Sequence, residues 1–178
     1  VRQRMDEGDD DWKLGADDCG RLLREGIQYY HRYVAFWHLK LYELCARDTQ
    51  RNLRLFAFVR KYARNLRDRM QFDQWRPYVT MMHTRAVAYP LVEAEEFEQA
   101  LREVDAGISG IRAFLDEYDQ ADRAEQCSEL TNLLSWKEEI GAAYAKMSRA
   151  GSDSDEGRSA VAELRDRLET AGAEERHG

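Results

Sequence analysis

The chain has 178 residues, of which 27 are Lys or Arg, 34 are Asp or Glu and only two are Pro. A content of 43% hydrophobic and 11% aromatic residues is enough to bury a core, which excludes wholesale disorder. No apolar run approaches the roughly 18 residues of a membrane span, so we expect no membrane partner. The three cysteines have no paired spacing, which excludes a disulfide framework and a zinc site and favours a reducing cytoplasm: Cys19, Cys45 and Cys127. The composition predicts one folded domain, and the start at Val1 rather than Met predicts a longer gene product.

An acidic stretch with few apolar residues predicts a flexible lead-in over residues 1–15. The shortage of proline then favours long helices. The first helix begins at an N-cap formed by Asp17 or Asp18 and continues to about residue 41, because apolar residues recur at spacings of three and four. We expect this stripe to face the core: Leu22, Leu23, Ile27, Tyr30, Val34, Trp37 and Leu41.

Four more helices follow by the same criterion, and no segment alternates as a strand does. Their predicted ranges are 42–66, 75–92, 97–115 and 121–148. Pro77 suits the first turn of the third of the five helices, and Pro90 is expected to kink or end it. A small, polar and acidic linker is predicted at 151–157, so a helical-repeat domain covers 16–150, and a short helix with a tail covers 158–178. The sequence thus predicts an all-α fold of about five long helices with a short C-terminal helix.

An internal repeat appears when the chain is shifted by 55 residues against itself. The shift places Phe56 over Ile111, and the preceding helices superpose as well. Phe97, followed three residues later by Ala100, resembles the second-helix signature of tetratricopeptide repeats, in which the small residue lets paired helices approach. The period exceeds the usual length of roughly 34 residues. We therefore expect two enlarged tetratricopeptide-like hairpins, capped by the fifth helix.

Several stretches resemble bacterial proteins described as UvrB/UvrC motif-containing. They are QYYHRY at 28–33, YEL at 42–44, RDTQRNLRLF at 47–56 and RPYVTMM at 76–82. The resemblance implies a tetratricopeptide-like helical region followed by a UVR motif, the short helical hairpin through which excision-nuclease subunits and some protease adaptors pair with partners. Residues 160–168 resemble the second helix of that hairpin, and the predicted linker stands where its first helix belongs. The resemblance implies an architecture and a habit of partnering, without any specific chemistry.

Basic side chains concentrate in one segment of this acidic chain. Residues 47–76 hold nine basic and three acidic side chains, a net charge of +6, whereas residues 77–178 sum to −11. Arg47, Arg51 and Arg54 fall at helical spacing on one face, which suits a polyanion or an acidic protein segment. The alternative is a solvated face whose charge is answered by acidic helices of the same molecule.

Aromatic residues concentrate over 29–42, densely enough to line a groove that binds a peptide. Packing explains the helical stripe within this region more simply, and Tyr29, Tyr33 and Phe36 are expected to divide between the core edge and the exposed surface. The candidate partner-binding residues are therefore Arg47, Arg51, Arg54, Tyr29, Tyr33 and Phe36.

Catalytic and metal sites find little support in the residues present. His31 and His38 lie two helical turns apart, about 10 Å in rise, which is too far to share one ion without further ligands. None of the five predicted helices holds a Glu-x-x-His pair, and the glycines at 107 and 110 lie inside a helix pattern without the Lys of a phosphate loop. Burial explains Cys45 better than nucleophilic chemistry does. We predict no enzyme activity, no catalytic residue, no metal and no cofactor.

The predicted function is that of a cytoplasmic scaffold or adaptor that binds a protein partner carrying an acidic, aromatic-containing segment. The alternative from another class is an accessory factor in DNA repair that contacts nucleic acid through the Arg-rich helix at 47–69, although the net charge of −7 disfavours nucleic acid. Homo-oligomerisation through the exposed ends of the repeat array is a third possibility.

Overall fold

A computed structural model describes residues 12–150, 159, 161–164 and 166–167. The predicted linker at 151–157 lies outside these residues, as do most of the predicted lead-in and tail. Throughout the described part the regular elements are helices, apart from one isolated backbone bridge, so the all-α prediction is confirmed. The chain divides into two compact units, residues 1–83 (unit 1) and 84–178 (unit 2), and the predicted domain at 16–150 contains parts of both.

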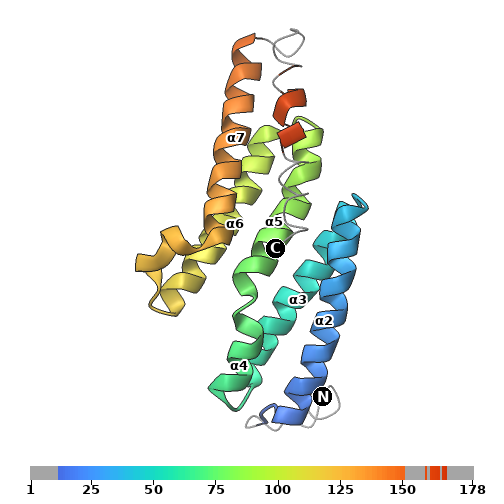
Figure 1. The fold of residues 1–178 in the computed structure, drawn as a ribbon, viewed down its shortest axis with the longest axis vertical. Helices are drawn as coiled ribbons and strands as arrows, with labels where there is room; N and C mark the ends of the chain where they lie inside the picture. Colours follow the sequence, from blue (N-terminus) through green and yellow to red (C-terminus); the bar gives the residue numbers. More distant parts are fainter. Residues whose placement is uncertain (1–11, 151–158, 160, 165, 168–178) are drawn as a thin grey trace. The chain divides into compact units, whose positions relative to one another are not determined.

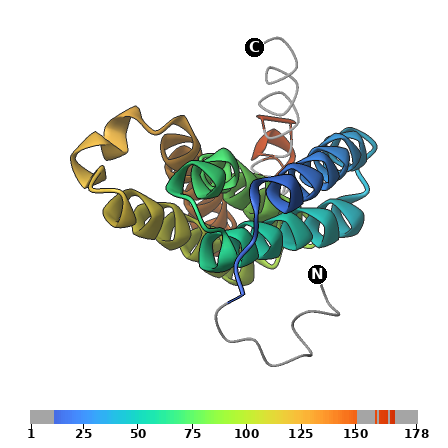
Figure 2. The ribbon, with the colours of Figure 1, turned by 90° about the horizontal axis from the view of Figure 1, so that it is seen from below.

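Unit 1 is built on a helical hairpin. Its helices α2 (Ala16–His38) and α3 (Tyr42–Tyr62) run side by side and are joined by a three-residue turn (Figures 1 and 2). The N-cap residue of α2 is Gly15, which precedes the predicted Asp17 and Asp18. Those two carboxylates lie instead in the first turn, where their negative charge interacts favourably with the positive end of the helix dipole.

The face of α2 that packs in the core differs from the predicted one. Its buried residues recur every seven positions: Cys19, Gly26 and Tyr33. The core-facing line is therefore rotated around the helix axis from the predicted stripe, and Ile27, Tyr30 and Leu41, predicted as core, are exposed. The prediction was wrong because α2 is apolar over about half its circumference, and spacing alone does not say which part of so wide an arc the neighbouring helix covers.

The beginning of the described chain packs against the far end of α3. The backbone N–H of Leu14 donates to the carbonyl of Tyr62 over 2.8 Å, and the side chain of Leu14 is fully buried. The predicted flexible lead-in at 1–15 therefore contains a core residue. A short helix that the sequence pattern did not indicate, α4 (Leu66–Asp73), follows α3 and buries Phe72.

The helix α5 (Arg76–Glu93) belongs to both units, since the boundary falls between His83 and Thr84. Pro77 lies in its first turn, as predicted. Pro90 does not end the helix, which continues for three further residues. Because Pro90 has no N–H to donate to the carbonyl of Ala86, the helix passes this residue with one backbone hydrogen bond fewer.

Unit 2 is built on α6 (Phe97–Glu117) and α7 (Ser128–Ala150), which pack together with the six-residue 3-10 helix η1 (Ala121–Gln126) between them in the chain. The predicted helix at 121–148 thus begins later, at Ser128. The buried residues of α6 recur at spacings of three and four, as predicted, and include Ala100, Val104, Ile108, Ile111 and Leu115.

Side-chain contacts hold α7 against α6. The rings of Phe97 and Tyr144 stack with centroids 5.8 Å apart, and the hydroxyl of Tyr144 donates to Glu98 over 2.8 Å. Lys137 forms an ion pair with Asp105 at 2.6 Å.

The 55-residue offset found in the sequence recurs in the backbone. Both α3 and α6 have 21 residues, and each bound of α6 lies 55 residues after that of α3. Lys40 and Glu95, in the turns that precede these helices, have positive φ angles of 57° and 62°. In both turns the next residue donates its backbone N–H to the carbonyl five residues earlier, over 2.8 Å. The two hairpins therefore reverse direction in the same way.

The described residues near the C-terminus are helical, and Val161 and Leu164 are buried. Leu164 lines a cavity of about 240 Å³ together with Ala142 and Ala143 of α7. Of the short helix predicted for this region, the described residues Val161 and Leu164 are thus buried, and Leu164 lies beside α7.

Candidate functional site

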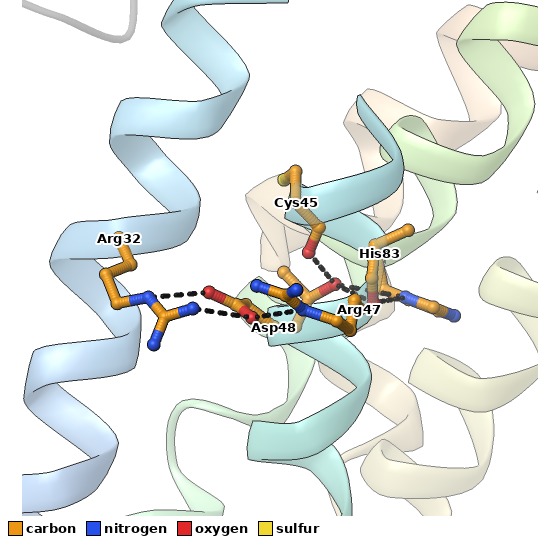
Figure 3. A network of polar contacts seen from close by, with 7 residues as sticks. Arg32, Cys45, Arg47, Asp48 and His83 are labelled. Carbon is orange, nitrogen blue, oxygen red and sulfur yellow. Dashed lines mark hydrogen bonds and ion pairs between the residues drawn. The ribbon is translucent and has the colours of Figure 1, made fainter. Parts of the chain in front are cut away.

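A buried carboxylate joins two arginines at the seam between α2 and α3 (Figure 3). Asp48, in the middle of α3, is 1% exposed. Arg32 of α2 approaches it from the facing helix, with Nε 3.1 Å from one carboxylate oxygen and Nη2 3.4 Å from the other. Arg47, its neighbour in α3, donates from Nε over 3.0 Å. The carboxylate is therefore held by two guanidinium groups.

The two arginines differ from Asp48 in exposure. The side chains of Arg32 and Arg47 are 46% and 58% exposed, so each is attached at one end to a buried charge and hydrated at the other. Leaving a buried carboxylate without a cationic partner costs several kcal/mol of folding free energy. This cost favours conformations in which the two arginines stay on Asp48. A guanidinium has five N–H donors, and those not used by Asp48 remain able to recognise a carboxylate or phosphate.

Aromatic rings complete the surface beside these arginines. The guanidinium of Arg32 lies 4.7 Å from the ring centroid of Tyr29 and 5.8 Å from that of Phe36. Arg51 lies 3.9 Å above the Tyr29 ring and forms an ion pair with Glu25. We call this surface the Arg–aromatic patch, defined by Tyr29, Arg32, Phe36, Arg47 and Arg51.

Polar contacts of the buried Thr49 and the partly buried His83 join two helices beside the patch. Thr49 donates its hydroxyl to the carbonyl of Cys45 over 2.8 Å, and Nδ1 of His83 lies 3.0 Å from that hydroxyl oxygen and 3.1 Å from the carbonyl of Ala46. The nearby carbonyl assigns the proton to Nδ1 of His83. These contacts attach the first half of α5 to α3 within unit 1, as Figure 3 shows.

A second buried bond sets the register between α2 and α3. The side-chain amide of Asn52 donates to the carbonyl of Gly26 over 3.0 Å. A Cβ at Gly26 would make an ordinary contact with the side chain of Leu55 at 3.4 Å, so the buried bond from Asn52, and not the absence of a side chain at Gly26, fixes this register. The relative positions of Arg32 and Asp48 are thereby determined by buried contacts.

The structure brings four of the six predicted site residues into one patch: Tyr29, Phe36, Arg47 and Arg51. Arg54 is exposed on the same helix but takes no part in the ring contacts described above. Tyr33 is a correction, because it is buried in the core, where its ring packs edge-on against Tyr30 at 5.5 Å, and burial raises the pKa of its hydroxyl.

The sequence did not reveal Arg32, which belongs to the patch, or the buried Asp48 that holds two of its arginines. Arg32 lies three residues after Tyr29 and four before Phe36, on one helical face, which was an available signal. Asp48 was counted among the charges of the basic segment, but nothing in the local pattern distinguishes a buried carboxylate from a solvated one.

Some arginines of residues 47–76 are paired within unit 1, by a carboxylate of the same segment and not by the acidic helices that the alternative interpretation names. The buried Asp73 accepts from Arg60 at 3.3 Å and Arg76 at 3.0 Å, and Arg69 donates from two nitrogens to the carbonyl of Ala63. Within the described residues, the exposed arginines without an ion pair in this segment are Arg54, Arg64 and Arg67.

The surroundings of Cys19 and Cys45 suit buried, unreactive thiols. Burial, reinforced by the nearby charge of Asp48, raises the pKa of the Cys45 thiol from 9.0 to about 12, and burial also raises the pKa of Cys19. In the described part of the chain no three His, Cys, Asp or Glu side chains gather in a way that could hold a metal ion. None of the described helices is long and apolar enough to cross a membrane.

No family model, curated protein or solved structure matches the chain.

Proposed function

We propose that the chain is a non-enzymatic scaffold or adaptor that binds a protein partner through the Arg–aromatic patch. The observation that carries this proposal is the attachment of Arg32 and Arg47 to buried Asp48, which orients two guanidinium groups beside aromatic rings before a partner arrives. Side chains held in advance lose less conformational entropy on binding. Arginine and tyrosine are also the residues most often found at interface hot spots.

The chemistry of the patch suits an acidic segment that also carries aromatic residues. Carboxylates can pair with the outward N–H groups of the arginines, and a partner's ring can stack beside Tyr29 or on a guanidinium face. Exposed charge steers such an encounter and selects against basic partners.

The repeat architecture supports a role in binding. We infer that the two hairpins are tetratricopeptide-like, since α3 and α6 have equal lengths and matching turns, and since Ala100 is buried three residues after the buried Phe97. If residues 160–168 derive from a UVR helix in a bacterial cytoplasmic protein, the burial of Val161 and Leu164 makes its apolar face unavailable. Partner binding would then fall to the Arg–aromatic patch.

The test is co-purification from the source cells with a variant that neutralises the patch without stranding a buried charge. Arg32→Gln and Arg47→Gln are combined with Asp48→Asn for this reason. The control is Arg64→Gln with Arg67→Gln, which also removes two arginines but from exposed positions outside the patch, and which makes the net charge more negative than the triple variant does. We expect the triple variant to lose a partner that the wild type and the control retain, and retention of every partner by the triple variant would refute the proposal.

The second candidate function is nucleic-acid binding by an accessory repair factor through residues 47–69. The observation in its favour is the exposure of Arg54, Arg64 and Arg67 without ion pairs among the described residues. A filter-binding titration against salt distinguishes it, because each phosphate contact releases counterions and makes the affinity fall steeply with salt. In this case the Arg64→Gln and Arg67→Gln control would lose affinity.

A further inference from the structure

One face of α2 carries a line of apolar side chains that the rest of unit 1 covers only in part, although the ring of Tyr30 also lies 6.2 Å from that of Tyr78 in α5. Ile27 and Tyr30 are 46% and 40% exposed, and Leu23 and Val34 are partly exposed. Their spacings of four, three and four place them on one side of the helix. We call this line the α2 stripe, defined by Leu23, Ile27, Tyr30 and Val34. At about 100° per residue, Ile27 and Tyr29 lie about 160° apart, so the α2 stripe and the Arg–aromatic patch face different directions.

The corresponding face of α7 is covered by a helix. Adding twice the 55-residue offset to the residue numbers of α2 gives nearly the range of α7. By this correspondence Lys137 of α7 matches Ile27 of α2, and Tyr144 matches Val34. Lys137 contacts Asp105 of α6, and Tyr144 stacks on Phe97 of α6. The residues that correspond to Leu23 and Tyr30 are fully buried: Leu133 and Ile140. The α2 stripe therefore has the geometry of a face that receives a helix.

The distribution of apolar surface indicates which helix can cover it. Among the described residues, every large hydrophobic side chain that is strongly exposed lies between residues 27 and 75, in unit 1: Ile27, Tyr30, Leu39, Leu41, Leu66 and Trp75. A head-to-tail contact with unit 2 of another copy would set this apolar surface against a polar one. A two-fold contact sets unit 1 against unit 1, and two-fold dimers are the most frequent protein assemblies.

We propose that the α2 stripe is the interface of a two-fold dimer, in which α2 packs antiparallel on α2 of a second copy. The register that matches apolar with apolar places Ile27 opposite Val34 of the second copy and brings Tyr30 and His31 beside the two-fold axis. Arg24, the exposed basic residue on the flank of the stripe, then lies about 20 Å along the axis from its counterpart. This separation exceeds the Debye length of about 8 Å at physiological salt, so the like charges are screened.

This interface does not depend on the function of the Arg–aromatic patch. Because the two surfaces face different directions around α2, the dimer presents two open patches. A partner with two acidic segments would gain avidity from this arrangement without any new contact.

The first experiment measures the mass of the full chain by light scattering over a wide range of concentration. We expect a concentration-dependent dimer that Ile27→Glu converts to a monomer, since the substitution places two carboxylates in an apolar contact. The matched control is Leu66→Glu, which changes a 67% exposed leucine of α4 that lies outside the stripe and should leave the dimer intact. Circular dichroism of both variants verifies that the helices remain folded.

The second experiment tests the register by crosslinking with a short thiol-reactive reagent in a Cys127→Ser background. His31→Cys should crosslink to its counterpart at the axis, whereas Arg24→Cys should not, because its counterpart is too distant. The proposal is overturned by a wild type that stays monomeric at every concentration, by a dimer that survives Ile27→Glu, or by equal crosslinking at the two positions. A monomer whose stripe instead captures a helix of another protein also overturns it.

Discussion

Arg32 and Asp48 form an ion pair across the α2–α3 hairpin in which the carboxylate is buried and the guanidinium is half exposed. The two partners are therefore not equivalent. If Asp48 is removed, Arg32 and Arg47 can hydrate, but if both arginines are removed, a buried carboxylate is left without a cation. The stability of unit 1 should depend on which side of the pair is changed.

The first prediction is that Arg32→Gln and Arg47→Gln are not additive. Each single substitution leaves one arginine on Asp48 and should lower the free energy of unfolding by about 1 kcal/mol. The double variant strands the carboxylate and should lose about 3 kcal/mol or more, which exceeds the sum. Urea denaturation of the four proteins measures the coupling. Adding Asp48→Asn to the double variant should recover much of the loss, and strict additivity would show that the carboxylate is not held as described.

The turns at Lys40 and Glu95 give a second prediction. Both residues have positive φ, where a side chain is strained and glycine is not. Lys40→Gly and Glu95→Gly should each raise the free energy of unfolding by about 0.5–1 kcal/mol, after allowance for the entropy that glycine gains in the unfolded chain. Thermal and urea denaturation provide the measurement. Leu39→Gly is the control, because Leu39 has a φ of −84° and should gain nothing. A loss of stability at both positive-φ sites would contradict the shared turn geometry.

The helices and the repeat offset could be predicted from the sequence because they depend on the local pattern of apolar residues. The boundaries of α6 follow from apolar spacing, and the 55-residue offset anticipated the equal lengths of α3 and α6. The grouping of Tyr29, Phe36, Arg47 and Arg51 also follows from helical spacing once α2 and α3 are paired.

The remaining features depend on contacts between helices. Tyr33 and Tyr30 are both tyrosines of one apolar arc, and the positions of the neighbouring helices decide that the first is buried and the second exposed. In the sequence Asp48 cannot be distinguished from the other charged residues of α3, because its burial and its ion pair with Arg32 depend on how α2 packs. A local pattern contains no information about which side of a helix a distant segment will cover.

The third prediction concerns the contact between Gly107 and Thr84 in unit 2. A Cβ on Gly107 would lie 2.9 Å from the Cβ of Thr84 and nearer still to its hydroxyl, so the two helices approach closely there. Gly107→Ala should lower the free energy of unfolding by about 1–3 kcal/mol through overpacking, although alanine is the better helix former. Thermal denaturation gives the size of the effect.

Gly141 of α7 supplies the matched control for Gly107. Apart from the adjoining residues and the backbone of α7 itself, no atom lies within 4 Å of the position that its Cβ would take, so Gly141→Ala should stabilise the protein by up to about 1 kcal/mol. Thr84→Ala removes the atoms nearest to the new methyl group and should partly rescue Gly107→Ala. Equal effects of alanine at 107 and 141 would rule out the close contact.

The last prediction is that stability declines above pH 9 through Cys45. Burial raises the pKa of this thiol from 9.0 to about 12, so between these values the unfolded chain has released a proton that the folded chain still holds. The folded state then binds more protons than the unfolded state, and the free energy of unfolding falls as the pH rises, by about 1.4 kcal/mol per pH unit for one group. The full stabilisation from the protonated Cys45 thiol is present below pH 9.

Other buried groups, such as Tyr33, titrate in the same direction, so the wild type alone does not isolate the effect of the Cys45 thiol. Cys45→Ala is therefore compared with the wild type by urea denaturation at several pH values between 8 and 11, since the other groups are common to both proteins. The stability difference between them should be constant below pH 9 and should shrink by about 1.4 kcal/mol per unit above it. A difference that stays constant across the range would mean that the thiol is not buried in the folded chain.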